Sequence, residues 1–136
     1  MEQIISDFVK ICKYIPYFET IDIAGFCRWE GGKTPGDHSF TMPYPVYEEK
    51  LLQFIDDASN SSLMDYGYTE TIQDYRIEPN SELIEQIDIA DLAFTRAVLT
   101  YYIRQERFCD GLWETAVKGG IFLALLKRLR TLLTES

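Results

Sequence analysis

Two stretches with strong helical periodicity meet at a short polar corner, and this pairing most constrains the fold of the chain. In residues 91–107 a narrow polar stripe runs beside a wide apolar arc, which is typical of a central helix packed on several sides. In residues 121–133 leucines and Phe122 form one face, and basic residues occupy the other. Asp110-Gly111 lies between them and predicts a helix stop at the glycine, with the aspartate capping the next helix.

Shorter apolar stripes with the same period predict further helices on either side of this corner. The predicted helices cover residues 4–15, 47–58, 83–87, 91–107, 112–117 and 121–133. Pro16 should end the first helix, because a proline inside a helix removes a hydrogen bond and clashes with the preceding turn. Pro45 should lie near the first turn of the second helix, and Asp91 should cap the fourth, with Asp88 as the alternative.

Between the first two helices, residues 20–44 have the pattern of a short β-hairpin. Apolar and aromatic residues within 21–29 favour an extended segment, and residues 39–42 can return as its partner. The turn between them contains three glycines and a proline, which are typical turn residues. Residues 63–80 are polar, rich in tyrosine and without clear periodicity, so we expect irregular surface structure with room for one short helix.

These patterns predict a mainly α protein, a single compact domain spanning residues 1–136 with about five to six helices. A chain of 136 residues can bury about two thirds of its unfolded surface, so it needs no disulfide or metal to fold. Its three cysteines form no CxxC or Cys/His cluster. The first residues lack a signal-peptide pattern, and no apolar run is long enough to span a membrane. We therefore expect a small soluble protein of the cytoplasm that uses no cofactor.

Acidic residues outnumber basic ones, and they are unevenly distributed. The net charge is −9. Residues 1–103 carry 7 basic and 18 acidic residues, a net of −11, whereas residues 104–136 carry 6 and 4, a net of +2. Because an acidic surface repels phosphate backbones, nucleic-acid binding is not expected. The basic C-terminal part can still hold an anion locally.

The polar residues of the corner are the best candidates for a functional site. Arg104 and Arg107 share one helix face, and Asp110 lies three residues further on. With Glu106 nearby, the two arginines can hold a carboxylate or phosphate by paired hydrogen bonds, and Trp113 can supply an aromatic wall. The structural alternative is that arginines are favoured at the C-terminal end of a helix dipole, and that Arg107 and Asp110 only pin the turn. Both interpretations stay open.

Other reactive residues give weaker signals. His38, the only histidine, lies in the glycine-rich loop, and no motif ties a serine or cysteine to it, so a catalytic triad is not expected. Cys109 precedes a helix start, where a thiolate would be stabilised, but burial is the expected role of a free cysteine. No catalytic residue, cofactor motif or metal site is recognisable.

The corner belongs to a longer pattern of residues. The pattern comprises Asp91-Leu92, Arg96, Thr100, Ile103-Arg104, Glu106-Arg107-Phe108-Cys109-Asp110-Gly111, Ala116, Gly120, Leu126 and Arg128-Leu129. Two N-terminal stretches extend it, Ile15-Pro16-Tyr17-Phe18-Glu19 and Trp29-Glu30-Gly31-Gly32. This pattern resembles the uncharacterised bacterial domain-of-unknown-function family 6508. The resemblance implies a small, mostly helical, cytosolic bacterial protein, and it brings no activity.

No motif specifies the function, and hypotheses from different classes remain. The first is a non-catalytic protein-interaction or structural module, with a homodimer as one arrangement. The second is a small anion-binding or ligand-binding protein, or a hydrolase, that uses Arg104, Glu106, Arg107 and Asp110. The third, an acidic mimic of nucleic acid, requires the carboxylates of residues 1–103 to form one continuous face.

Overall fold

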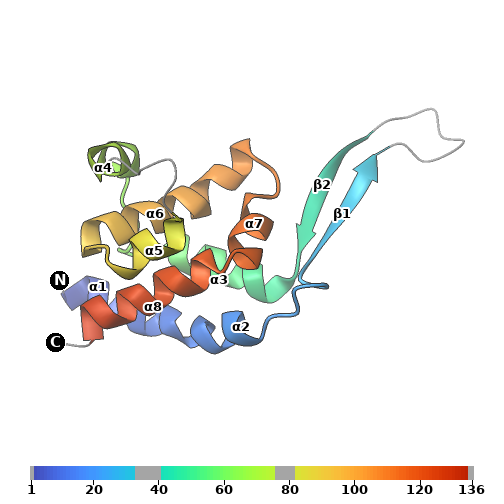
Figure 1. Cartoon of the computed structure of the whole chain (residues 1–136). Helices are drawn as coiled ribbons and strands as arrows, with labels where there is room; N and C mark the ends of the chain where they lie inside the picture. The colour runs from blue at the N-terminus through green and yellow to red at the C-terminus, as the bar shows by residue number, and fades with distance from the viewer. Residues whose placement is uncertain (1, 33–40, 76–81, 135–136) are drawn as a thin grey trace, which may run out of the picture.

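Helices make up most of the structure, and one pair of strands projects from them (Figure 1). The structure is a computed structural model, and it describes residues 2–32, 41–75 and 82–134. In chain order the elements are α1 (Glu2–Ile11), η1 (Cys12–Tyr14), α2 (Ile15–Thr20), β1 (Cys27–Gly32), β2 (Thr41–Tyr47), α3 (Glu49–Ser59), α4 (Tyr68–Tyr75), α5 (Leu83–Asp88), α6 (Leu92–Gln105), η2 (Glu106–Phe108), α7 (Leu112–Lys118) and α8 (Ile121–Thr134). The predicted fold class, mainly α with a short β-hairpin, is confirmed.

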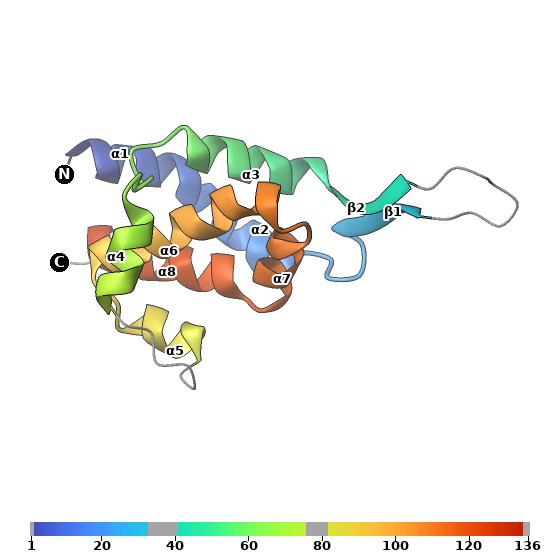
Figure 2. The ribbon, with the colours of Figure 1, turned by 90° about the horizontal axis from the view of Figure 1, so that it is seen from above.

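Helices α6 and α8 form the centre of the fold, because between them they contact all the other helices. α8 packs against α1, α2, α5, α6 and α7, and α6 also contacts α3, α4 and α7. Seen from above, α1 and α3 lie along one edge and α5 along the other, with α2, α6 and α8 between them (Figure 2). Within the described ranges, no helix is both long and apolar enough to cross a bilayer.

Aromatic rings join α2, α3 and α8 in the core. Phe54 meets Phe18 edge-on at 4.9 Å between ring centroids, and it meets Phe122 at 5.2 Å. Tyr14 adds an edge-on contact to Phe54 at 5.4 Å. All four side chains are buried. Because burial of each large apolar side chain contributes about 1.5–3 kcal/mol, this cluster holds together segments that are far apart in the sequence.

The middle of the polar stripe on α6 holds the loop that precedes α4. Arg96 donates hydrogen bonds to three successive carbonyl oxygens, those of residues 62, 63 and 64, at 2.9, 3.1 and 3.0 Å. Thr100 is fully shielded from solvent, and its Oγ1 accepts the N–H of Asp65 at 2.9 Å. The stripe therefore satisfies backbone groups that a buried loop would otherwise leave without partners.

The first predicted helix is interrupted before Pro16 rather than ended by it. α1 ends at Ile11, one 3-10 turn follows, and Pro16 lies in the first turn of α2. A proline is tolerated at that position because the first N–H groups of a helix have no partner inside the helix.

The prediction that Pro45 lies near the first turn of a helix is wrong, because Pro43 and Pro45 lie in β2 and α3 begins at Glu49. β1 and β2 pair antiparallel, with Trp29 opposite Pro45. Each strand of a two-stranded sheet is an edge, and an edge leaves backbone N–H groups unpaired, so it accommodates prolines. Tyr47, predicted at the start of a helical stripe, is therefore the last residue of the strand.

The tyrosine-rich stretch predicted to be mostly irregular contains α4, which packs on α6. The predicted cap of α6 is confirmed, since Oδ1 of Asp91 accepts the N–H of Phe94 at 2.9 Å. Residues 30–32 of the predicted hairpin turn belong to β1, whereas its residues 33–37 and His38 lie outside the described residues.

Candidate functional site

The corner between α6 and α7 contains the residues predicted as a site. α6 ends at Gln105, the 3-10 turn η2 follows, and Cys109 donates its N–H back to the carbonyl oxygens of Gln105 and Glu106. Gly111 then adopts a φ of +93°. Glycine accepts this left-handed conformation without steric cost, as predicted. Gly111 precedes α7, however, and does not cap the C-terminal end of α6, which already ends at Gln105.

Glu106 is the centre of this corner, and its side chain is buried. Its Oε2 accepts the N–H of Gly111 at 2.9 Å, and its Oε1 accepts the N–H of Trp113 at 2.8 Å. Oε1 also accepts the hydroxyl proton of Tyr47 at 3.0 Å. The carboxylate therefore supplies acceptors to the first N–H groups of α7, and it ties the end of β2 to the corner.

Tyr47 and Trp113 are held together beside Glu106. Their ring centroids lie 5.2 Å apart, and Nε1 of Trp113 donates to the carbonyl oxygen of Tyr102 at 2.8 Å. Burial, and then the hydrogen bond to Glu106, raises the pKa of the Tyr47 hydroxyl above its usual value. The hydroxyl therefore stays protonated at neutral pH and keeps donating to the carboxylate.

The predicted capping of α7 by Asp110 is wrong, because Glu106 takes that role from the preceding turn. Gly111 occupies the N-cap position without a side-chain cap, and Asp110 is exposed. Within the described residues, no ion pair joins Arg107 to Asp110, so that pair does not pin the turn.

Arg104 and Arg107 contact aromatic rings instead of carboxylates. The guanidinium of Arg104 lies 5.5 Å from the centroid of the Tyr66 ring, and that of Arg107 lies 4.6 Å from the centroid of the Phe108 ring. Neither arginine forms an ion pair with a carboxylate in the described part of the chain. Stacking on a ring leaves the N–H donors of a guanidinium available, so both arginines retain the capacity to bind an anion.

All the predicted site residues line one hollow of 410 Å³. Its lining consists of Ile55, Ser59, Ile103, Arg104, Glu106, Arg107, Asp110 and Trp113. A second hollow, of 390 Å³, shares Glu106, Asp110 and Trp113 with the first. The rest of its lining consists of Tyr44, Pro45, Val46, Tyr47 and Leu52. We call the two hollows together the corner surface.

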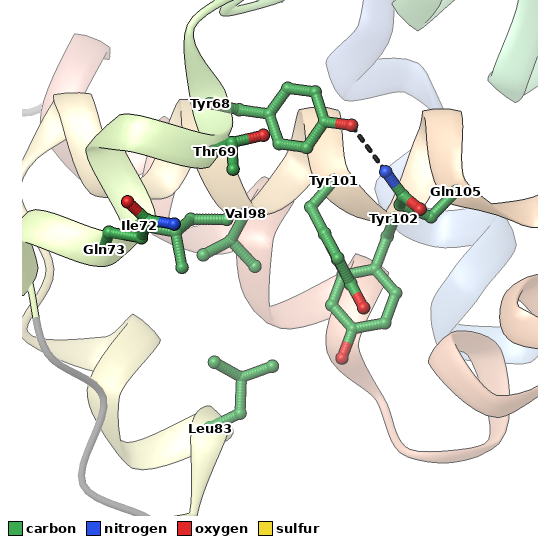
Figure 3. Close-up of a pocket in the computed structure, with 9 residues that line it drawn as sticks. All are labelled: Tyr68, Thr69, Ile72, Gln73, Leu83, Val98, Tyr101, Tyr102 and Gln105. Carbon is green, nitrogen blue, oxygen red and sulfur yellow. Dashed lines mark hydrogen bonds between the residues drawn. The ribbon is translucent and has the colours of Figure 1, made fainter.

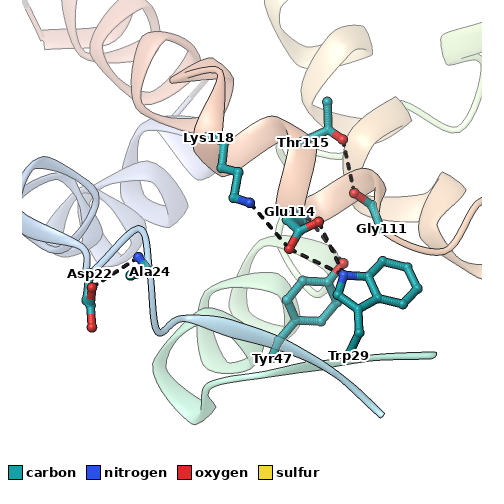
Figure 4. A network of polar contacts seen from close by, with 8 residues as sticks. All are labelled: Asp22, Ala24, Trp29, Tyr47, Gly111, Glu114, Thr115 and Lys118. Carbon is teal, nitrogen blue, oxygen red and sulfur yellow. Dashed lines mark hydrogen bonds and ion pairs between the residues drawn. The ribbon is translucent and has the colours of Figure 1, made fainter. Parts of the chain in front are cut away.

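Trp29 connects β1 to the same corner, and its role was not foreseen from the sequence. Its Nε1 lies 3.3 Å from both carboxylate oxygens of Glu114, and Lys118 approaches that carboxylate at 3.7 Å (Figure 4). The Trp29 ring packs so closely on Gly111 that a Cβ there would lie 2.9 Å from Cζ2. Trp29 and Glu114 are 85 residues apart, so no local pattern could indicate the contact.

Two cysteines, Cys27 and Cys109, lie near the corner. Cys109 is exposed, and the prediction that it is buried is wrong, because α6 ends at Gln105 and the following turn leads the chain off its buried face. Burial, and then the nearby Glu114, raises the pKa of the Cys27 thiol to about 11. No group of three or more His, Cys, Asp and Glu side chains among the described residues is placed to hold a metal ion.

A comparison with protein families finds one family model that matches nearly the whole chain. A family model matches residues 5–135, a range that includes the hairpin, the helical core and the corner. The chain belongs to the family of unknown function DUF6508. The resemblance carried by the corner pattern is thereby confirmed. None of the curated proteins and none of the solved structures compared matches the chain. Membership in this family supplies no activity, so the function rests on the geometry of the corner.

Proposed function

We propose that this chain is a non-catalytic protein-interaction module that receives a segment of a partner protein on the corner surface. The observation that carries the proposal is the pair of adjoining hollows around Trp113, bordered by exposed apolar side chains. Tyr44 and Leu52 line the second hollow and are 43% and 45% exposed. Exposed apolar surface with a polar rim is characteristic of protein-interaction sites.

The charges on the rim indicate which partner segment fits. Arg104 and Arg107 have no ion-pair partner among the described residues, whereas three hydrogen-bond donors compensate the charge of Glu106. Asp110 remains as the one exposed carboxylate in the lining. We therefore expect a segment that places an aromatic or aliphatic side chain in the hollow and a carboxylate beside the arginines.

The same contacts favour binding over catalysis. Both oxygens of Glu106 accept hydrogen bonds from the protein, so this carboxylate is not free to act as a base. Ser59 supplies the only hydroxyl in the lining of the first hollow, and it donates to the carbonyl oxygen of Ile55 at 2.5 Å. A nucleophilic serine needs a hydrogen bond to a base instead.

A small anion is the second candidate ligand, and one observation favours it. Arg104, Glu106, Arg107 and Asp110 all line the first hollow. The two guanidinium groups can hold the carboxylate or phosphate of a small molecule, with Trp113 as a wall. This alternative differs from the first in that it requires no apolar occupant from another protein.

The cellular setting is part of the proposal. Cys12, Cys27 and Cys109 are all free thiols, and Cys109 is exposed. Free thiols persist where glutathione and thioredoxin keep them reduced, which supports a cytoplasmic location. The partner can be a second copy of this chain, since the corner surface also offers apolar side chains.

Selection from a random linear peptide library displayed on phage tests the proposal. We expect the enriched peptides to combine an aromatic or aliphatic residue with a nearby Asp or Glu. Leu52→Asp should abolish their binding, because it places a charge in the apolar lining. Val9→Asp is the matched control, since Val9 is 57% exposed and lines neither hollow.

Arg107→Ala separates binding from stability. This substitution should lower the affinity for the selected peptides by about tenfold, because a charge-assisted hydrogen bond is lost. It should change the free energy of unfolding by less than about 0.5 kcal/mol, as is usual for an exposed side chain. Peptides that bind Leu52→Asp as well as the wild type would contradict the proposal.

Two further measurements distinguish the other occupants. Inorganic phosphate that perturbs the NMR signals of Arg104 and Arg107, without any enriched peptide, would favour the small-anion alternative. Light scattering after size exclusion, on the wild type and on Leu52→Asp, tests for a second copy of the chain. A dimer that Leu52→Asp converts to a monomer would identify the partner as the same protein.

A further inference from the structure

A pocket of 440 Å³ lies between α4, α5 and α6, away from the corner surface (Figure 3). It shares no lining residue with either hollow of the corner. Helix α4 supplies Tyr68, Thr69, Ile72 and Gln73, helix α5 supplies Leu83, and helix α6 supplies Val98, Tyr101, Tyr102 and Gln105. Its volume falls within the range of about 300–1,000 Å³ that is usual for small-molecule sites.

Tyrosine rings form the walls of this pocket. Tyr68 meets Tyr101 edge-on at 6.4 Å between ring centroids, and Tyr101 meets Tyr102 edge-on at 5.2 Å. In Figure 3 the rings of Tyr101 and Tyr102 reach from α6 toward Leu83. The buried side chain of Val98 lies beside them. Rings at right angles present both faces and edges, and both arrangements are favourable for contacts with a flat aromatic ligand.

The polar groups of the pocket are neutral. Gln105 donates from Nε2 to the Tyr68 hydroxyl at 2.5 Å, which leaves the Gln105 carbonyl oxygen and the Tyr68 hydroxyl proton for a ligand. Burial raises the pKa of the Tyr102 hydroxyl, so this hydroxyl remains uncharged and can donate. Among the described residues that line the pocket, none is an Asp, Glu, Lys, Arg or His.

We propose that this pocket is a binding site for a small, neutral, planar aromatic molecule with one or two hydrogen-bonding groups. The apolar walls exclude an ion, because a charge placed among them would lose hydration without gaining an opposite charge. The hydroxyls and the carboxamide orient the ligand by accepting or donating single hydrogen bonds. This site is independent of the protein-interaction role proposed for the corner surface, and it adds a second ligand class.

Two fluorescent probes that share one ring system test the site in the full chain. N-phenyl-1-naphthylamine is neutral and aromatic, and 8-anilinonaphthalene-1-sulfonate adds one negative charge. We expect the neutral probe to bind with an increase in emission and to bind at least about tenfold more tightly than the sulfonate. Equal affinity for the two probes would overturn the proposal, as would the absence of binding by the neutral probe.

Matched substitutions locate the bound probe. Thr69→Trp fills the pocket from an exposed position of α4, whereas Glu70→Trp places the same side chain next to it without lining the pocket. Tyr101→Ala removes one wall, and Tyr44→Ala is its control in the corner surface. The two pocket variants should lower the affinity for the neutral probe by about tenfold. The two controls should lower it by less than about twofold.

Comparing the probe affinities of all four variants decides the outcome even if one variant folds poorly. Far-ultraviolet circular dichroism should show wild-type helix content in Thr69→Trp, because residue 69 is exposed. Probe binding that survives both pocket variants, or that Tyr44→Ala weakens more than Tyr101→Ala, would place the probe elsewhere and overturn the proposal. Failure of the peptide selection at the corner surface would leave this result unaffected, since the two sites share no lining residue.

Discussion

The hydroxyl of Tyr47 donates a hydrogen bond to the buried carboxylate of Glu106 at 3.0 Å, and this contact joins the hairpin to the helical corner. The same carboxylate accepts the N–H groups of Gly111 and Trp113. One side chain thus positions β2, the start of α7 and the floor of the corner surface. Removing it should disturb all three elements together.

A double-mutant cycle on Glu106 and Tyr47 measures that coupling. Glu106→Ala should lower the free energy of unfolding by about 2–3 kcal/mol, because it leaves buried donors without an acceptor. Tyr47→Phe should cost about 1 kcal/mol alone and less in the Glu106→Ala background. Urea unfolding provides the values. Tyr44→Phe is the control on the same strand, and additive losses for Tyr47 and Glu106 would contradict the coupling.

Arg96 should be the most important arginine for stability. Arg96→Ala should cost about 1–3 kcal/mol, because three carbonyl oxygens of the loop before α4 lose their donor. Arg96→Lys should retain only part of the stability that Arg96→Ala loses, since an ammonium group cannot match the geometry of the guanidinium. Hydrogen exchange of residues 62–67 reports the loosened loop. Arg107→Lys, at an exposed arginine whose guanidinium stacks on Phe108, should leave that exchange unchanged.

Any side chain at residue 111 should destabilise the corner. Gly111→Ala forces a Cβ to within 2.9 Å of the Trp29 ring and holds alanine at a φ of +93°. We expect a loss of about 1–2 kcal/mol from the left-handed conformation alone, together with a change in tryptophan emission as Trp29 moves. Gly67→Ala is the control, since the nearest atom to its Cβ would be 3.6 Å away. Equal melting temperatures for the two variants would refute the prediction.

Asp7 should make stability depend on acid pH. Its Oδ2 accepts the N–H and the hydroxyl of Ser62 at 2.8 and 2.7 Å, and these hydrogen bonds lower the pKa of the carboxyl group below its usual 3.8. The stabilisation is therefore present above the unfolded pKa, and it is lost as the pH falls through the lower pKa of the folded state. Asp7→Asn should be less stable than the wild type near neutral pH.

The difference between Asp7→Asn and the wild type should shrink as the pH falls below about 4. Urea unfolding at neutral pH and in acid measures it. Asp88→Asn, at an exposed carboxylate of α5, is the control and should have little effect in either condition. A constant difference for Asp7→Asn across this range would contradict the prediction.

The helices with strong periodicity were predictable, because their signals are local. The apolar arcs of α6 and α8 and the Asp91 cap each depend on residues within one or two turns of each other. The prolines of β2 were misinterpreted because Pro45 is equally compatible with the first turn of a helix and with an edge strand. Only pairing with β1 distinguishes the two, and that pairing is set by residues such as Trp29.

The candidate site was predictable as a set of residues but not as a set of roles. Arg104, Glu106, Arg107, Asp110 and Trp113 do line one hollow. Their sequence spacing is compatible with an Asp110 cap and an Arg107–Asp110 pair, neither of which forms in the described residues. The pocket between α4 and α6 was missed, because its tyrosines belong to segments more than twenty residues apart and α4 has little periodicity.

The sequence by itself determined the helices, the glycine turn at residue 111 and the side chains gathered at the corner, because periodicity, capping and φ preference act over a few residues. The tertiary structure decided what those side chains do. The sequence spacing between a carboxylate and its neighbouring arginines is the same whether the carboxylate is exposed to water or caps the N-terminus of a helix. Glu106 became the buried acceptor because β2 brought Tyr47, 59 residues away, against it. Arg104 and Arg107 stayed on the rim, where they stack on the rings of Tyr66 and Phe108.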